Sequence, residues 1–184
     1  MLNNKLKLIL PSLLGLLFVA LMMFALTSQE GKRVTSSVLV GKPIPDFTAR
    51  SLNSDTNLLD NRVLQTDKKF TLLNVWASWC AVCQSEHDFL TTLVIKDDVR
   101  IVGLNYRDER VDAKHVLSML GNPYVVNIFD PNGKLALDMG VISTPETYLL
   151  DREGIVLYRY SGALDAVAWQ HYFKPLIQLL INEK

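Results

Sequence analysis

The chain has 184 residues, and its 19 basic residues equal its 19 acidic residues, so its formal net charge is zero. This length suits one domain with short extensions, and the charge balance excludes the basic composition of typical nucleic-acid-binding proteins. Two cysteines are too few for a structural disulfide framework, and the three histidines, at positions 87, 115 and 171, lack the spacing of metal ligands. We therefore expect no nucleic acid, no metal and no other cofactor.

The first predicted element is the apolar segment Leu8–Leu26, which contains 19 residues and no charged residue. A helix of this length measures just under ~30 Å, about the thickness of the hydrocarbon layer of a membrane. Lys5 and Lys7 precede the segment and favour an N-terminus in the cytoplasm. These features predict a transmembrane helix that exports the rest of the chain.

A cleaved signal peptide is the alternative for the same segment. The apolar core of a signal peptide usually has ~7–15 residues and ends in a small-x-small site, whereas this run is longer and continues into Leu26-Thr27-Ser28-Gln29. We therefore predict an uncleaved anchor at residues 1–26, a linker at residues 27–40 and an exported domain at residues 41–184.

The exported part alternates apolar runs of strand type with helical patterns. An α/β fold follows, because alternating strands and helices pair in parallel, while a closing hairpin adds antiparallel strands. We predict a central mixed sheet flanked by helices, with a kink at Pro175 in the last helix. The predicted elements are an extended entry at 41–47, strands at 70–76, 99–105 and 127–129, helices at about 80–93 and at 111–120, a turn at 130–133, a hairpin of 146–150 and 155–160, and a helix at 165–181.

The two cysteines form a C-x-x-C pair, Cys80-Ala81-Val82-Cys83, between a predicted strand and a predicted helix. Cys80 would lie at the helix N-terminus, where free backbone N–H groups and the helix dipole stabilise a thiolate. Cys83 lies three residues further on and can reach the sulfur of Cys80. We predict Cys80 as the more exposed nucleophile and Cys83 as the resolving thiol, with Trp79 as apolar cover.

Three other interpretations of the pair are weaker. A zinc site needs four ligands, and no second cysteine pair or histidine pair completes one. A purely structural disulfide or two inert thiols remain open, but inert free thiols are unusual in an oxidising compartment.

Together these residues resemble the thioredoxin superfamily, and more closely its cytochrome c maturation branch (CcmG, also called DsbE). The resemblance spans about residues 40–178 and includes the N-terminal anchor. It rests on Gly41-Lys42-Pro43, Leu72 to Cys80, Glu86-His87, Val102 to Tyr106, Leu120-Gly121-Asn122-Pro123-Tyr124, Pro145-Glu146-Thr147, Tyr158 to Gly162 and Lys174-Pro175-Leu176.

The resemblance implies a thioredoxin-like fold and a protein-disulfide reductase in the bacterial inner membrane, with its domain in the periplasm. The implied substrate is apocytochrome c, or a maturation partner that handles its cysteines, and the implied electron donor is a membrane thiol relay. The rival functions are a general periplasmic thiol oxidant and a copper-handling module, although a copper module usually has C-x-x-x-C spacing.

The resemblance also implies further site residues. Pro145 should be cis and face the cysteines, although local propensity alone makes a cis X-Pro bond a minority outcome, ~5–6%. Thr144 should offer its backbone to an extended substrate, and Glu86 and Glu146 should lie near the pair. Like charge disfavours a thiolate, so we expect both glutamates to raise the pKa of Cys80 and the reduction potential to lie nearer ~−270 mV than ~−120 mV.

Overall fold

The computed structural model describes residues 4–27, 39–97 and 99–182. These fall into two compact units, Met1–Val34 and Thr35–Lys184. The predicted linker, residues 27–40, lies mostly outside the described residues, so its structure is not discussed further.

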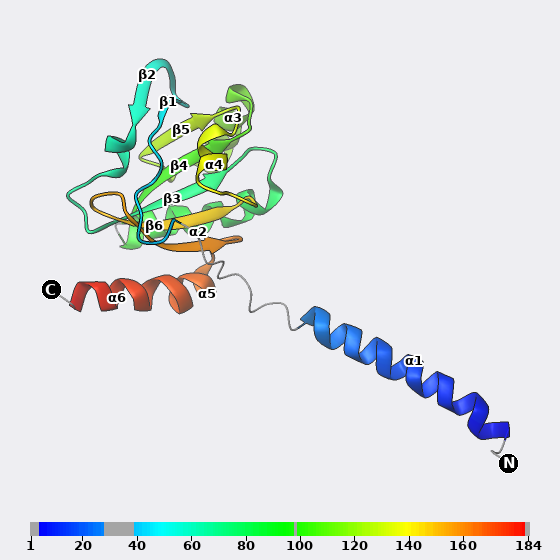
Figure 1. The fold of residues 1–184 in the computed structure, drawn as a ribbon. Helices are drawn as coiled ribbons and strands as arrows, with labels where there is room; N and C mark the ends of the chain where they lie inside the picture. Colours follow the sequence, from blue (N-terminus) through cyan, green and yellow to red (C-terminus); the bar gives the residue numbers. More distant parts are fainter. Residues whose placement is uncertain (1–3, 28–38, 98, 183–184) are drawn as a thin grey trace. The chain divides into compact units, whose positions relative to one another are not determined.

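The second unit is built on a seven-stranded sheet with the order β2-β1-β5-β4-β3-β6-β7 (Figure 1). The central strands β3, β4 and β5 pair in parallel, and all other neighbours are antiparallel. The predicted mixed sheet is therefore confirmed. The strands are β1 Thr48–Ser51, β2 Ser54–Asp60, β3 Phe70–Trp76, β4 Arg100–Tyr106, β5 Val126–Asp130, β6 Glu146–Asp151 and β7 Val156–Ser161.

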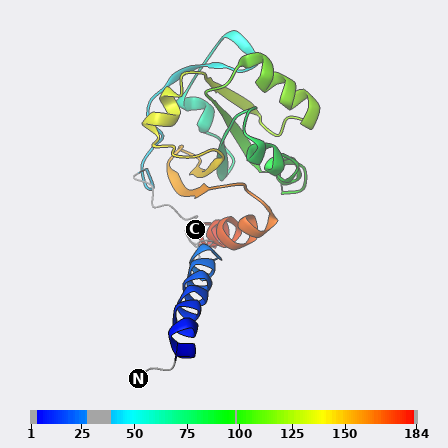
Figure 2. The ribbon, with the colours of Figure 1, turned by 90° about the vertical axis from the view of Figure 1, so that its right-hand side faces the viewer.

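Alternating side chains of β3 divide the core into two layers. Leu72 and Trp76 pack on one face with α2 (Ala81–Asp97), α3 (Arg110–Leu120) and the C-terminal helical segments. Leu73 and Val75 pack on the other face with the short helices η2 (Asn61–Leu64) and α4 (Lys134–Asp138). Strand side chains point to opposite faces in turn, and Figures 1 and 2 show helices on both sides of the sheet, as predicted.

Two elements differ from the sequence prediction. The antiparallel hairpin β1–β2 extends the sheet beyond β5 where no strand was expected. Its residues are mostly polar and exposed, so they lack the apolar run of a buried strand. The short helix α4 follows the predicted turn at residues 130–133, and its five residues are too few to show a helical period.

The C-terminal helix is irregular just before Pro175, the residue at which the sequence predicts a kink. It consists of α5 (Ala166–Ala168), a π-helical turn η3 (Trp169–Phe173) and α6 (Lys174–Asn182). Proline lacks an N–H group and its ring displaces the carbonyl four residues earlier, here that of His171. The wide π turn lies at that point.

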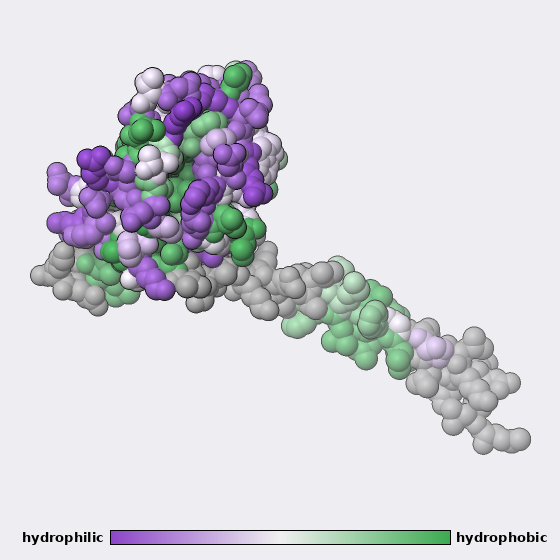
Figure 3. Space-filling view, turned by 45° about the horizontal axis from the view of Figure 1, so that its top comes forward, coloured by the Kyte–Doolittle hydropathy of each residue, from purple (hydrophilic) through white to green (hydrophobic). Residues whose placement is uncertain are grey.

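The first unit contains the helix α1, Asn4–Thr27, at the position predicted for the anchor, with Pro11 inside it. Figure 3 shows hydrophobic side chains along its described part, whereas the visible face of the second unit is mostly hydrophilic. Over the residues that the structure describes, no helix combines the length and the apolar character required to cross a membrane.

Candidate active site

The cysteine pair lies directly after the central strand. β3 ends at Trp76, a short turn follows, and α2 begins at Ala81, so Cys80 immediately precedes the first helical residue. Cys80 and Cys83 form a disulfide with a Cα–Cα distance of 5.3 Å. The strand–turn–helix placement predicted from C-x-x-C is therefore confirmed.

The sulfur of Cys80 has two backbone neighbours. The N–H group of Cys83 donates to Cys80 Sγ over 3.1 Å, and the carbonyl oxygen of Thr144 lies 3.6 Å from the same sulfur. After reduction, the N–H group at this helix terminus can stabilise a Cys80 thiolate. This contact distinguishes the two cysteines.

Exposure distinguishes the cysteines far less than we expected. Cys80 is 6% exposed and Cys83 is 4% exposed, so both are covered in the oxidised protein. The order agrees with the prediction, but the difference is too small to explain separate roles. Position at the helix terminus distinguishes the two cysteines more clearly than exposure does.

The peptide bond between Thr144 and Pro145 is cis, which confirms the expectation from the family resemblance. A cavity of about 230 Å³ lies beside Thr144. Trp79, which is 58% exposed, forms one of its walls, and its Nε1 donates to the carbonyl oxygen of Arg107 over 2.9 Å. The cavity is lined by Trp79, Tyr106, Val141, Ile142, Ser143 and Thr144.

Glu86 lies one turn of α2 beyond Cys83 and is 2% exposed. Its carboxylate accepts hydrogen bonds from Asn74 Nδ2 at 2.9 Å and from the N–H group of Leu164 at 2.6 Å. Burial raises the pKa of Glu86 to about 7, although these two hydrogen bonds favour the charged form. Glu86 can therefore exchange a proton near neutral pH, close to the cysteines.

Asn74 connects Glu86 to other buried polar groups. Its Nδ2 also donates to Thr147 Oγ1 at 3.1 Å, and Tyr124 donates its hydroxyl to Asn74 Oδ1 at 2.9 Å. Burial, and then the charge of Glu86, raises the pKa of Tyr124 well above its ordinary value. A polar residue in an apolar strand was the sequence signal for this cluster, because an unpaired buried amide is costly.

Glu146 is also buried, at 0% exposure, but its surroundings are different. Arg159 donates to both of its carboxylate oxygens, from Nη2 at 2.7 Å and from Nε at 3.0 Å. Glu146 also accepts hydrogen bonds from the backbone of Ile142 and Ser143, just before Thr144. It therefore holds the loop before the cis-proline, and the guanidinium balances its charge.

No motif in the sequence identified Arg159 as a partner of Glu146. The detectable signal was a charged residue inside the predicted strand at 155–160, which must be paired if that strand is buried. The effect of Glu146 on the pKa of Cys80 should accordingly be smaller than the sequence suggested. Glu86, by contrast, is bound by neutral groups only, the amide of Asn74 and the N–H group of Leu164.

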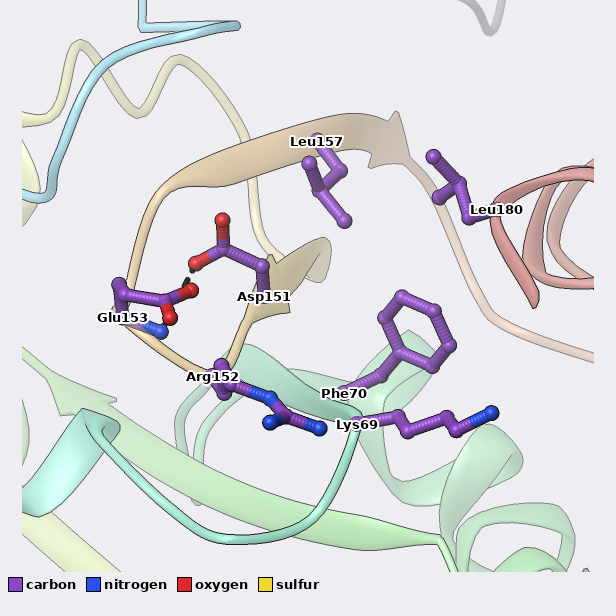
Figure 4. Close-up of a pocket in the computed structure, with 7 residues that line it drawn as sticks. All are labelled: Lys69, Phe70, Asp151, Arg152, Glu153, Leu157 and Leu180. Atoms are coloured by element: carbon purple, nitrogen blue, oxygen red, sulfur yellow. Dashed lines mark hydrogen bonds between the residues drawn. The ribbon is translucent and has the colours of Figure 1, made fainter. Parts of the chain in front are cut away.

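A cavity of about 220 Å³ lies at the beginning of β3, whereas the cysteines follow its end. In Figure 4, Phe70, Leu157 and Leu180 face a common space, with Lys69 and Arg152 near its margin. No cysteine lines this cavity. The cysteines, not the size of a cavity, therefore locate the redox site.

Comparisons with known proteins agree with this geometry. The Redoxin family model matches residues 39–168. Thiol:disulfide interchange protein DsbE of Tatumella citrea is 43% identical over 176 residues, covering 94% of each chain, and DsbE of Escherichia coli K12 is 41% identical over 172 residues, covering 92% of each. A crystal structure of a putative DsbE from Chlorobium tepidum has a TM-score of 0.62 at 24% identity and covers 78% of this chain and 96% of its own, which supports the thioredoxin-like fold.

Proposed function

The chain belongs to the Redoxin family and, within it, to the thiol:disulfide interchange proteins of the DsbE type, and from this premise we propose that it reduces protein disulfides during cytochrome c biogenesis. Its activity as a thiol-disulfide oxidoreductase follows from the family and the C-x-x-C pair. The reducing direction, the substrate and the location are the parts that we propose.

The proposed reaction is a dithiol–disulfide exchange. The Cys80 thiolate attacks one sulfur of a substrate disulfide, forms a mixed disulfide and releases the other substrate sulfur as a thiolate, which takes up a proton. Cys83 then loses its proton and attacks Cys80 Sγ. This step closes the Cys80–Cys83 disulfide and releases the second substrate thiol, so two electrons and two protons pass to the substrate. A membrane thiol relay would restore the dithiol.

The buried carboxylate of Glu86 supports the reducing direction and is the observation on which the proposal rests. The groups that bind this carboxylate, Asn74 and the N–H group of Leu164, are neutral. When Glu86 is charged, its field disfavours thiolates nearby and so disfavours the reduced state. The pair then gives up electrons more readily, as a reductant must.

The cavity beside Thr144 supports binding of an extended substrate. Thr144 would offer its backbone to a peptide next to Cys80, Pro145 would shape that edge, and Trp79 would contact an apolar side chain of the peptide. A flexible segment of apocytochrome c that carries a C-x-x-C motif suits such a site, because an extended chain can present its sulfur to a covered Cys80.

We propose that Leu8–Leu26 anchors the protein in the inner membrane and that the domain faces the periplasm. The apolar segment and Lys5 and Lys7 support this topology. Alkaline phosphatase fused after Lys184 should be active, because it folds outside the cytoplasm. An inactive fusion together with an active cytoplasmic reporter at the same position would reverse the orientation.

Trapping the mixed disulfide tests the substrate directly. In cells, Cys83→Ser should accumulate an adduct on Cys80, because the resolving thiol is missing, and the adduct should contain an apocytochrome c or a maturation partner. Cys80→Ser is the matched control and should trap neither. Adducts with many unrelated periplasmic proteins would instead indicate a general thiol oxidoreductase.

A further inference from the structure

The turn that carries the nucleophile is held by a carboxylate from another strand end. Asp108 lies in the loop between β4 and α3 and is 7% exposed. Its Oδ2 accepts a hydrogen bond from the N–H group of Ser78 at 2.6 Å, and its Oδ1 accepts one from the Ser78 hydroxyl at 2.6 Å. Ser78 is two residues before Cys80, so these bonds fix the backbone that leads into the nucleophile.

Asp108 is itself held in place by its neighbours. Asn105 Nδ2 donates to Oδ2 at 2.8 Å, and the N–H group of Glu109 donates to Oδ1 at 2.9 Å. Each carboxylate oxygen therefore accepts two hydrogen bonds. Hydrogen bonds to a charged acceptor are roughly twice as strong as neutral ones, so Asp108 is a stiff connection between the β4–α3 loop and the turn.

The same loop has a second contact with this turn. The carbonyl oxygen of Arg107 accepts the hydrogen bond from Trp79 Nε1. Arg107 has a φ of 45°, in the left-handed region that few non-glycine residues adopt. Its N–H group donates to the carbonyl oxygen of Asp130 at 3.0 Å, which helps to maintain this conformation. Adjacent residues of the loop thus hold Ser78 and Trp79, the residues immediately before Cys80.

We propose that Asp108 is a positioning residue that keeps Cys80 Sγ aligned with Cys83 and so accelerates the resolution of mixed disulfides. Holding reacting atoms in place raises the rate of an intramolecular step. With Ser78 fixed, the backbone at Cys80 cannot drift, and the sulfur stays next to the Cys83 N–H group. The inference rests on the dithiol chemistry and not on the cytochrome c role proposed above.

The step affected is the attack of Cys83 on a mixed disulfide at Cys80. With glutathione as the probe, the Cys83 thiolate bonds to Cys80 Sγ, the bond between Cys80 and glutathione breaks, and glutathione leaves as a thiolate. The proton lost by Cys83 is taken up by glutathione. The step needs no further oxidant, because the mixed disulfide already contains the oxidising equivalents.

The test measures this step by itself. The reduced full-length chain in detergent is loaded at acidic pH with glutathione pyridyl disulfide, the pH is raised to near neutral, and the loss of the adduct is followed by acid quenching and mass spectrometry. We expect Asp108→Ala to slow resolution about tenfold and Ser78→Ala, which removes one hydrogen bond and no charge, about threefold. Asp108→Asn should be intermediate, because one acceptor oxygen remains.

Glu109→Gln is the matched control, since it removes an adjacent, exposed carboxylate whose side chain does not cap α3. Its rate should equal that of the wild type. A folded Asp108→Ala protein that resolves at the wild-type rate would overturn the proposal, even if its denaturation midpoint were lower. If Asp108→Ala does not fold, Ser78→Ala decides: slowed resolution supports the positioning role and an unchanged rate refutes it.

Discussion

Glu86 and Glu146 lie on opposite faces of the sheet, and the groups around the two carboxylates differ. Glu86 lies on the face covered by α2 and is bound by neutral groups. Glu146 points to the other face, where it forms a bidentate ion pair with Arg159. Both carboxylates are almost completely buried.

Burial alone therefore does not determine what a carboxylate contributes to the site. With a guanidinium beside it, Glu146 contributes its hydrogen bonds and holds a loop, and its charge is balanced locally. Burial raises the pKa of Glu86, and no cation is among the groups that bind it to balance the charge of the carboxylate. Substitutions on one face can therefore be compared with substitutions on the other.

The largest effect should come from removing Arg159. Arg159→Met leaves Glu146 buried without its counter-charge, and breaking one side of a buried pair typically costs ~3–5 kcal/mol. Urea denaturation of the wild type and the variant measures this loss. The control is Arg62→Met, because Arg62 pairs with Asp60 at the surface, with side chains 84% and 39% exposed, and such solvated pairs contribute little to stability. Equal losses in both variants would contradict the distinction.

The next effect is a pH dependence on the Glu86 face. The pKa of Glu86 is raised in the folded protein, so the neutral form is favoured there, and its stabilising contribution is complete below the ordinary value of 4.5 and lost as the pH rises through about 7. The free energy of unfolding should therefore fall by on the order of 3 kcal/mol across this window relative to Glu86→Gln.

Urea denaturation at a series of pH values, with the difference between the two proteins plotted, measures this contribution. Glu153→Gln, which changes an exposed carboxylate, should follow the wild type. A constant difference between wild type and Glu86→Gln from about pH 5 to about pH 8 would show that Glu86 has the same pKa in both states.

A smaller effect concerns the reduction potential. Glu86→Gln removes a negative charge near the cysteines, so it should favour the thiolate and make the protein more oxidising by about 30 mV, which corresponds to ~1.4 kcal/mol. Equilibration with glutathione near pH 8 measures the shift. Near pH 6 the shift should become smaller, because wild-type Glu86 is then mostly protonated. A wild-type potential close to ~−120 mV would overturn the reducing direction itself.

The smallest effect should be that of Glu146 on the potential. Because Arg159 balances its charge, Glu146→Gln should shift the potential by less than Glu86→Gln does, while lowering stability through the unpaired Arg159. The same glutathione equilibration compares the two variants. An equal or larger shift for Glu146→Gln would mean that its charge reaches Cys80 despite the ion pair.

The sequence was sufficient for features that depend on local pattern. The apolar run of β3 indicated a buried strand, and C-x-x-C after it located Cys80 at a helix N-terminus. The cis bond before Pro145 came from the family resemblance, since local propensity favours trans.

Features that depend on long-range pairing could not be predicted. Glu146 meets Arg159 because β6 and β7 pair in a specific register, with Tyr148 opposite Arg159. Asp108 meets Ser78 because β3 and β4 are parallel neighbours whose ends lie together. Neither contact produces a periodic signal in the sequence. The polar hairpin β1–β2 likewise gains its place in the sheet by pairing with β5, not from an apolar pattern of its own.

The nearly complete burial of both cysteines has a consequence for selectivity. A reducing dithiol that reacted with every disulfide around it would be oxidised without reducing its own substrate. Cys80 is 6% exposed and its sulfur lies 3.6 Å from the carbonyl oxygen of Thr144, so a disulfide fixed inside a folded protein has little access to this sulfur. An extended segment can enter beside Thr144. The low exposure of the sulfur thus limits electron transfer to partners whose shape lets a disulfide reach Cys80.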